Sequence, residues 1–243
     1  MGTKAEEAAR ARLVERLKFF DEIGAGFLSR DEIKTSPASP AAAPSVSGRS
    51  DSSEPSGADL EGLREQIIVC TKCVLSEGRT RAVPGEGDPQ AALLFVGEGP
   101  GQEEDIQGRP FVGRAGQLLT KIIAAMSFER SQVFITNIVK CRPPGNRVPR
   151  REEVEACAPY LLAQIRVLRP KVIVTLGKSA ADFFFPDAPL AMTALRGSFR
   201  DWNGIAVMPT FHPSYLVRNE GNLRLKKMVW DDMKKVMARL AEP

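Results

Sequence analysis

The stretch LLFVGEGPGQEEDIQGRPFVGRAG, residues 93–116, decides the fold of this chain. It begins with the apolar residues 93–96, a run of the length expected for a buried parallel strand. The strand then stops at Gly97-Glu98-Gly99-Pro100-Gly101, where glycines permit backbone geometries that other residues avoid. Ligands of open α/β sheets bind beyond the carboxyl ends of the strands. The segment therefore predicts a strand that ends in a polar loop, which is either a ligand pocket or an ordinary connection to the next helix.

Apolar strands alternate with helical patterns over the rest of the chain. Further strands are expected at 133–137, 171–176 and 205–208, and helices at 60–69, 115–126, 151–168, 178–184 and 223–240. Alternation of this kind favours a parallel sheet with helices on both faces. We therefore expect an α/β fold over residues 59–243, a single three-layer domain with a central four-stranded parallel sheet flanked by helices.

The first 58 residues differ in composition from the rest of the chain. Residues 4–28 show a helical pattern, and we assign residues 1–34 to an N-terminal helical appendage. Residues 35–58 are rich in Ser, Pro and Ala, and they can bury too little apolar surface to offset the entropy lost on ordering. We interpret them as a disordered linker. The appendage either binds a protein partner or lies on the main domain, and the sequence does not choose between these.

The composition of the whole chain restricts the classes of protein to which it can belong. Hydrophobic residues make up 43%, enough for a sizeable core, and the net charge of +4 permits a nucleic-acid partner without requiring one. No apolar run approaches the ~20 residues of a membrane span, and the charged N-terminus lacks the apolar segment of a signal peptide. We expect a cytoplasmic protein without membrane association, in which cysteines are more often metal ligands or free thiols than disulfides.

The four cysteines of the chain have the spacing of a metal site. Cys70 and Cys73 form a C-x2-C pair, Cys141 follows after 67 residues and Cys157 after 15 more. Four thiolates suit structural zinc or an iron–sulfur cluster. A redox-active C-x-x-C pair and unliganded buried cysteines are the alternatives. The chemistry of the residues alone does not separate zinc from iron–sulfur.

Three of the expected strands are followed or ended by polar residues. Glu98 follows the first strand, Asn137 ends the second, and His212, the only histidine, follows the fourth. Because the carboxyl ends of parallel strands lie at one edge of a sheet, these residues can face a common cleft. Asn137 has an alternative explanation as a turn or cap residue, and His212 as a hydrogen-bonded loop histidine. A basic cluster near this edge suits phosphates, or is a solvated helix start; it comprises Arg142, Arg147, Arg150 and Arg151 with Asn146.

Together these residues resemble one known family, the family 4 (iron–sulfur) uracil-DNA glycosylases. The resemblance covers roughly residues 63–240 and rests on GEGPGQEED at 97–105, GRPFVGRAGQLL at 108–119, TNIVKCRPPGNR at 136–147 and FHPSYLVR at 211–218. It implies a 4Fe-4S cluster on the four cysteines and a uracil-DNA glycosylase-like fold. It also implies hydrolytic excision of uracil from single- or double-stranded DNA, without a lyase step, by a monomer in the cytosol or nucleoid of a bacterium or archaeon. The alternative is a catalytically inactive iron–sulfur DNA-binding module of the same fold.

The resemblance also implies roles for individual residues. Glu98 would position a water and stabilise the cationic sugar, and His212 would donate a hydrogen bond to O2 of the leaving uracil. Phe111 would stack on the flipped base. Asn137 would recognise uracil N3–H and O4 and so reject cytosine, while Glu104 would exclude the methyl group of thymine.

The remaining implied residues surround the base pocket and the DNA. Backbone amides of Gly99 and Gly101 would line the pocket, and Asn146 matches a residue of the site region without a defined role. Two arginines would contact phosphates, and one of two residues in the last motif would fill the gap left by the flipped base. These four are Arg142 and Arg147, and Tyr215 or Leu216.

Overall fold

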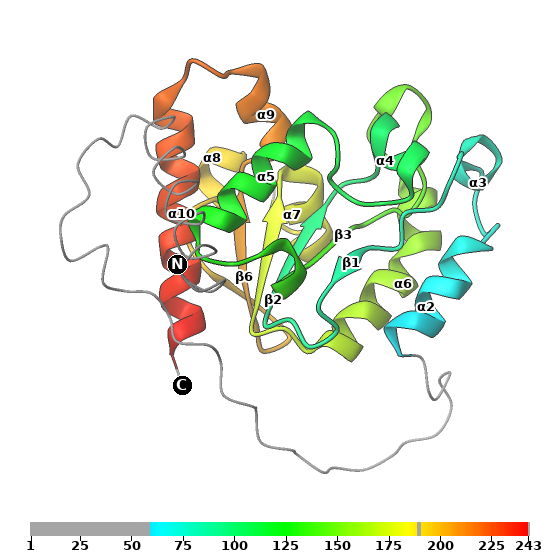
Figure 1. The fold of residues 1–243 in the computed structure, drawn as a ribbon, viewed down its shortest axis with the longest axis horizontal. Coiled ribbons are helices and arrows are strands. Elements are labelled where there is room, and N and C mark those ends of the chain that lie inside the picture. The colour runs from blue at the N-terminus through cyan, green and yellow to red at the C-terminus, as the bar shows by residue number, and fades with distance from the viewer. Residues whose placement is uncertain (1–58, 189–190, 243) are drawn as a thin grey trace, which may run out of the picture.

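The computed structural model describes residues 59–188 and 191–242. The predictions for the appendage at 1–34 and for the linker at 35–58 lie outside these residues. Figure 1 shows a central sheet between two layers of helices, with α5 and α10 on one face and α2 and α6 on the other. None of the helices in the described part of the chain combines the length and apolarity that a membrane span requires.

The sheet has six strands in the order β1-β3-β2-β4-β6-β5. They are β1 Glu86–Gly87, β2 Leu93–Gly97, β3 Phe134–Asn137, β4 Val172–Leu176, β5 Arg200–Trp202 and β6 Ile205–Thr210. The four inner strands are those that the sequence predicts, and they pair in parallel. The expected four-stranded parallel sheet was wrong in its extent, because β1 and β5 add antiparallel edges. These strands are two and three residues long, too short to show a periodic pattern.

The five helices expected in the described region all form, and none of their ends differs from the expected position by more than one residue. The helices are α2 Leu60–Ile68, α3 Leu75–Gly78, α4 Gln102–Gln107, α5 Arg114–Ala125, α6 Arg151–Leu168, α7 Lys178–Phe184, α8 Met192–Leu195, α9 Pro213–Arg218 and α10 Leu223–Ala241, with 3-10 turns η1 Arg130–Gln132 and η2 Pro144–Asn146. The sequence did not predict α3, α4, α8 and α9. Each has six residues or fewer, less than two full turns, so its pattern cannot be separated from that of a loop.

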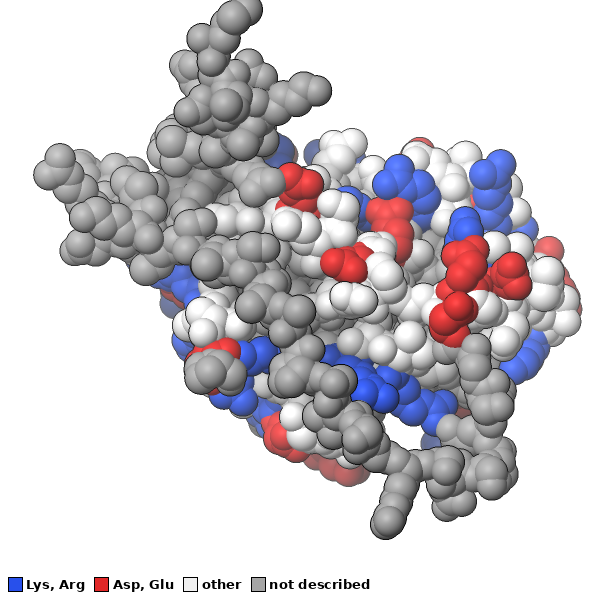
Figure 2. Space-filling view, turned by 60° about the horizontal axis from the view of Figure 1, so that its bottom comes forward, with Lys and Arg blue, Asp and Glu red and all other residues white. Residues whose placement is uncertain are grey.

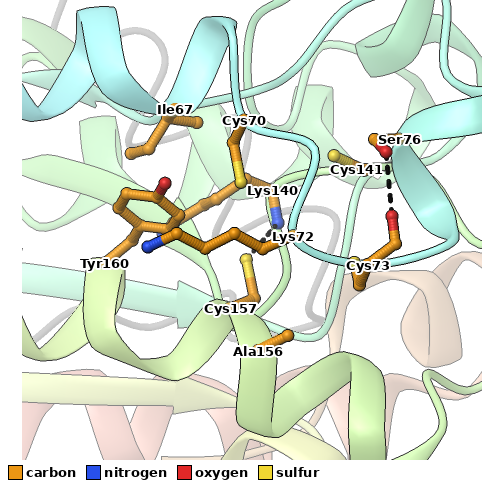
Figure 3. Close-up of a pocket in the computed structure, with 10 residues that line it drawn as sticks. All are labelled: Ile67, Cys70, Lys72, Cys73, Ser76, Lys140, Cys141, Ala156, Cys157 and Tyr160. Atoms are coloured by element: carbon orange, nitrogen blue, oxygen red, sulfur yellow. Dashed lines mark hydrogen bonds between the residues drawn. The ribbon is translucent and has the colours of Figure 1, made fainter.

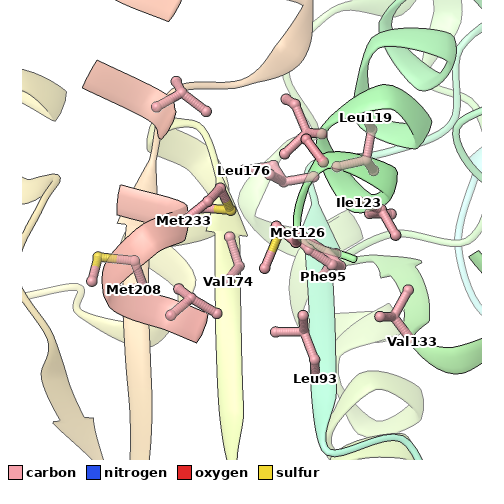
Figure 4. Close-up of a cluster of buried hydrophobic side chains, with 14 of the residues drawn as sticks. Leu93, Phe95, Leu119, Ile123, Met126, Val133, Val174, Leu176, Met208 and Met233 are labelled. Carbon is pink, nitrogen blue, oxygen red and sulfur yellow. The ribbon is translucent and has the colours of Figure 1, made fainter. Parts of the chain in front are cut away.

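Alternate residues of β2 face two different cores, and this alternation produces the three layers. Leu93 and Phe95 pack with α5 and α10, in the cluster drawn in Figure 4, where Met233 of α10 is labelled beside the sheet. Leu94 and Val96 pack with α2, α6 and α7 on the other face. Every residue of β2 is buried. Burial on both faces explains why this strand is a continuous apolar run and not an alternating one.

The carboxyl ends of the parallel strands lie at the upper end of the molecule in Figure 1, beside α4, α7 and α9. Figure 2 brings the lower end forward, and on the visible described surface basic side chains lie beside acidic ones. The site predicted from the sequence belongs to the upper end.

Candidate active site

Glu98, Asn137 and His212 lie at the same edge of the sheet. Glu98 directly follows β2, Asn137 is the last residue of β3, and His212 lies two residues beyond β6. Gly97 and Asn137 are register partners across the β2–β3 pair, and β4 separates β2 from β6. The parallel sheet therefore brings together three residues that are far apart in the sequence.

The side chain of Asn137 is buried and one of its polar atoms lacks a partner. Asn137 is 1% exposed, and among the described residues its Oδ1 has no hydrogen-bond donor. A Cβ at Gly97 would lie 2.4 Å from this Oδ1 and 2.5 Å from the Phe111 ring, so only glycine leaves the space open. Leaving a buried acceptor unpaired costs about 1–3 kcal/mol. Such an atom is best explained by a ligand N–H that completes it.

Phe111 is held in an unusual backbone conformation beside this amide. Its φ of 50° lies in the left-handed region, which is costly for a residue other than glycine. Its carbonyl reaches the first turn of α5 because Gly116 has no side chain; a Cβ there would lie 1.9 Å from that oxygen. The ring centroid is 5.7 Å from that of His212, with the planes tilted by 34°. The aromatic ring predicted for base stacking therefore lies near both Asn137 and His212.

Glu104 holds together the two loops that flank α4. Its Oε1 accepts hydrogen bonds from the N–H groups of Val112 and Gly113, both at 2.9 Å. Its Oε2 accepts one from the N–H of Gly101 at 3.1 Å. The Gly101 amide predicted to line the pocket is thus engaged within the protein. Glu104 shapes the loop that carries Phe111, in addition to the methyl exclusion implied by the motif.

His212 is positioned as a neutral hydrogen-bond donor. It precedes α9, where the N–H of Ser214 donates to His212 Nδ1 at 3.0 Å and Ser214 Oγ lies 2.8 Å from the same nitrogen. Burial, together with the charge of Arg218, lowers the pKa of His212 to about 4. The imidazole is therefore neutral at pH 7, and because Nδ1 accepts, its proton is on Nε2. That N–H is available to a substrate oxygen.

Sequence reasoning missed Ser179, which contacts the candidate catalytic acid. Ser179 Oγ donates a hydrogen bond to Glu98 Oε2 from the first turn of α7. The contact joins residues that are 81 positions apart. No local pattern in the sequence marks it, because a serine at a helix start is ordinary.

All four cysteines line one pocket, which Figure 3 shows between the segment that follows α2, the N-terminal half of α6 and the segment after β3. None of the four forms a disulfide bond. Burial raises the pKa of the Cys141 thiol, and it raises that of Cys157 to about 11. Within residues 59–188 and 191–242, no three His, Cys, Asp or Glu side chains converge as ligands of a single metal ion. The donor set itself, four thiols around one pocket, fits an iron–sulfur group.

N–H donors approach the sulfur atoms from two sides. Arg79 Nη1 donates to Cys141 Sγ at 3.1 Å and to the Cys70 carbonyl at 2.8 Å, while its Nη2 binds a carbonyl of α2. The backbone N–H of Lys140 lies 3.3 Å from Cys157 Sγ. Such donors stabilise thiolates over thiols, which is the form that binds metal.

Lys140 connects the cysteine pocket to Asn137. The residue is 1% exposed, and burial lowers the pKa of its ammonium to about 7. Its Nζ donates to Thr136 Oγ1 at 2.6 Å, to the Asn137 carbonyl at 2.7 Å and to Gln164 Oε1 at 2.8 Å. The short segment from Asn137 to Cys141 therefore ties the buried amide to the cysteine site.

The residues predicted to bind DNA around η2 make contacts within the protein. Arg142 Nε donates to Asn146 Oδ1 at 2.8 Å, and Arg147 makes two hydrogen bonds of 2.8 and 2.6 Å to Glu153. The Glu153 side chain is fully buried, so Arg147 anchors this loop to α6. Asn146 is exposed with a φ of 55°, and the structure does not place it with Asn137 in the buried site.

The two residues of α9 that could fill the gap left by the flipped base differ in their exposure. Tyr215 is 39% exposed, whereas Leu216 is 2% exposed and belongs to the core beneath α5 and α10. Tyr215 also packs against the Phe211 ring, with centroids 5.3 Å apart. A DNA contact by Leu216 is not available in this arrangement, because its side chain would have to leave the core.

Arg147→Ala should lower the melting temperature at neutral pH, and the effect should fade in acid. Arg147 holds the pKa of the Glu153 carboxyl below its ordinary value of 4.5, with help from the Arg150 N–H. The stabilisation is therefore present above about pH 4.5 and is lost as the pH falls through the lowered pKa of the folded state. Thermal unfolding of both proteins at pH 7 and pH 3 measures this difference.

Arg151→Ala is the matched control for this comparison, because the Arg151–Glu155 pair is exposed and should contribute little. Equal melting temperatures of wild type and Arg147→Ala at pH 7 would contradict the anchoring role of Arg147.

Comparison with known proteins defines the class of this one. The uracil DNA glycosylase superfamily model matches residues 84–234, which contain all three strand-end residues. A Type-4 uracil-DNA glycosylase of Thermotoga maritima is 49% identical over 177 residues, 72% of this chain and 92% of that protein. One from Sulfurisphaera tokodaii is 47% identical over 185 residues, 73% and 83% of the two chains. A third, from Saccharolobus solfataricus, is 42% identical over 191 residues, 75% and 87%. Within the superfamily, the chain belongs to the type-4 uracil-DNA glycosylases, as its motifs indicate.

Proposed function

We propose that this protein excises uracil from DNA by hydrolysing the N-glycosidic bond, leaving an abasic site. Its membership of the type-4 family supports this activity. The observation that carries the proposal is the buried Oδ1 of Asn137, which has no donor among the described residues and faces Gly97 and the Phe111 ring. Uracil presents a donor at N3, whereas cytosine presents an acceptor there. An amide held in this way pairs with uracil and leaves cytosine unpaired.

The base must leave the duplex to reach this site. A base inside a double helix is inaccessible, so the nucleotide is extruded into the pocket and stacks on Phe111. Tyr215, which is exposed at the start of α9, fills the space that the base vacates. Arg142 and Arg147 contact phosphates around the η2 loop. Glu104 closes the side of the pocket at which thymine carries its methyl group.

Glu98 and His212 act on the two sides of the bond that breaks, Glu98 on the sugar and His212 on the uracil. As the C1′–N1 bond lengthens, positive charge develops on the sugar and the electron pair passes to uracil. Glu98 stabilises the sugar and orients the water that adds to C1′, and the water's proton passes to the carboxylate or to solvent. The neutral His212 donates from Nε2 to O2 of the departing uracil. We propose no lyase step, which would need a lysine amine as the nucleophile. Lys140, three residues after Asn137, is buried, and its Nζ donates to three acceptors within the protein.

We propose that Cys70, Cys73, Cys141 and Cys157 hold a 4Fe-4S cluster. Such a group, when bound, would hold the four thiolates together. Arg79 and the Lys140 N–H then stabilise the thiolates. The hydrogen bond from Lys140 Nζ to the Asn137 carbonyl connects this region to Asn137. The role proposed for the cluster is structural.

Arg79→Met should make this cluster more labile. The guanidinium joins Cys141 Sγ to two carbonyls near Cys70, so its loss removes both a donor to sulfur and a tie between two ligand segments. Bleaching of the cluster's visible absorbance in the presence of an iron chelator should be faster than in wild type. Arg79→Lys keeps the positive charge but lacks the planar guanidinium, so its rate of bleaching should be intermediate.

The matched control is Arg81→Met, an exposed arginine two residues away. If Arg79→Met and Arg81→Met both bleach at the wild-type rate, the proposed support of Cys141 by Arg79 is wrong.

The test of the proposed function is incubation of the purified protein with a labelled uracil-containing oligonucleotide, followed by alkali to break abasic sites. Strand breaks that require uracil in the DNA are the expected result. Binding of the DNA without any breaks would favour the inactive DNA-binding module instead. Single- and double-stranded substrates are both included, because the proposal covers both. We propose that the protein acts as a monomer in the cytosol.

A further inference from the structure

β4 is the one inner strand whose end carried no candidate residue in the sequence. It is followed by Gly177 and then by α7. In the sheet β4 lies between β2 and β6, so its end is flanked by the segments that carry Glu98 and His212. α7 packs against both β4 and β2. The β4–α7 junction is therefore placed between the two residues proposed to act on the glycosidic bond.

Two residues of this junction contact the two acting residues separately. Gly177 has a φ of 90°, and a Cβ at this position would lie 3.0 Å from the Cβ of His212. The Gly177 N–H donates to the Thr210 carbonyl of β6 at 2.9 Å. Ser179 donates its hydroxyl proton to Glu98 Oε2. The junction thus sets the position of Glu98 and His212 relative to each other.

Ser179 engages only one of the two oxygens of the Glu98 carboxylate. Among the described residues, Ser179 is the hydrogen-bond donor to Oε2 of Glu98, and none donates to Oε1. A single donor on one oxygen restricts rotation of the carboxylate and leaves the other oxygen to accept from a water. This is the arrangement that an oriented nucleophilic water requires.

The hydroxyl of Ser179 is not used as a helix cap. Gly177 is the N-cap of α7, and no side chain caps this helix. A serine at the N-cap would bond to a backbone N–H of its own helix, but Ser179 lies two residues beyond the N-cap. Here the hydroxyl instead reaches a carboxylate on another strand end, so its contribution is to Glu98 and not to α7.

We propose that Ser179 is a positioning residue that holds the Glu98 carboxylate with Oε1 directed at the attacking water. The inference rests on the proposed function, because it acts through Glu98. Loss of the hydroxyl frees the carboxylate to rotate, which slows the bond-breaking step and leaves base recognition by Asn137 and Phe111 untouched. The effect should therefore appear in kcat and not in KM.

The test compares single-turnover and steady-state kinetics of the cluster-loaded protein on a uracil-containing oligonucleotide. Ser179→Ala should reduce kcat by roughly ten- to a hundredfold, the range for a hydrogen bond to a charged group, with KM and melting temperature unchanged. Ser179→Thr restores a hydroxyl at the same position and should recover most of the rate. Ser131→Ala is the matched control, because it removes an exposed serine–glutamate hydrogen bond outside the site.

The outcomes separate this inference from the proposed function. Wild-type kcat in Ser179→Ala, alongside a Glu98→Ala protein that has lost activity, would overturn the positioning role alone. A kcat loss that Ser179→Thr does not recover, accompanied by a lower melting temperature, would also overturn it, since the role would then be structural. Full activity in Glu98→Ala would overturn the positioning role together with the role of Glu98, but would leave uracil excision standing. A wild-type protein that leaves uracil in place would overturn the proposed function as well.

Discussion

Replacing Glu98 by alanine should reduce the rate of uracil release by roughly 10²–10⁴-fold, the usual contribution of a positioned acid or base. The carboxylate lies directly after β2, held by Ser179, at the edge that also carries Asn137 and His212. Its removal takes away both the group that orients the water and the negative charge that stabilises the sugar. Binding of the base depends on other residues, so the loss should appear in kcat.

The measurement is a single-turnover time course on the uracil oligonucleotide with enzyme in excess. Glu98→Gln tests the carboxylate with little change of shape, because the amide oxygen can still accept from Ser179 while the charge and the second acceptor oxygen are gone. Cluster absorbance and melting temperature establish that each variant is folded. A Glu98→Ala protein that released uracil at the wild-type rate would show that another group orients the water.

Replacing Asn137 by aspartate should lose uracil excision by roughly 10²-fold or more, the scale of removing one oriented donor to a developing anion. The amide is 1% exposed, so a carboxyl at this position would be forced toward its neutral form by burial. A neutral carboxyl has one donor and one acceptor that can exchange places, so it can pair with N3 and N4 of cytosine, whereas its ionised form has no donor for O4 of uracil. The preference for uracil over cytosine, roughly 10⁴–10⁵ for a site built on matched hydrogen bonds, should collapse.

Parallel assays on uracil- and cytosine-containing oligonucleotides of one sequence measure this preference. Asn203→Asp, on the exposed turn between β5 and β6, is the control for adding a carboxyl to the surface. If Asn137→Asp kept the full rate and selectivity for uracil, Asn137 would not be the residue that reads the base.

Much of the candidate site is visible in the sequence because strand ends are local features. The apolar run before Glu98, the run that ends in Asn137 and the run that precedes His212 are continuous, since β2 and β3 are buried throughout and β6 over its last four residues. Once the strands are assigned, their parallel pairing places these residues at one edge. The four cysteines and their spacing were likewise visible in the sequence, before the structure showed the pocket that they line.

Other parts of the site depend on contacts between residues that are distant in sequence. The bonds from Val112, Gly113 and Gly101 to Glu104 exist because α4, too short for a periodic pattern, folds across the loop before α5. Burial of Leu216 follows from how α9 packs on α5, and it leaves Tyr215 as the exposed residue of the pair. Neither property can be read from the residue types.

The sequence by itself determined the α/β class, the inner strands, the cysteine set and the family, because these follow from apolar periodicity and from residues in fixed order. Only the tertiary structure decided that antiparallel edges extend the sheet, that Arg147 pairs with a buried Glu153 and that Ser179 lies on Glu98. The physical reason is that hydrogen bonds and burial depend on distance in space. The end of β4 lies between β2 and β6 only after the sheet has formed.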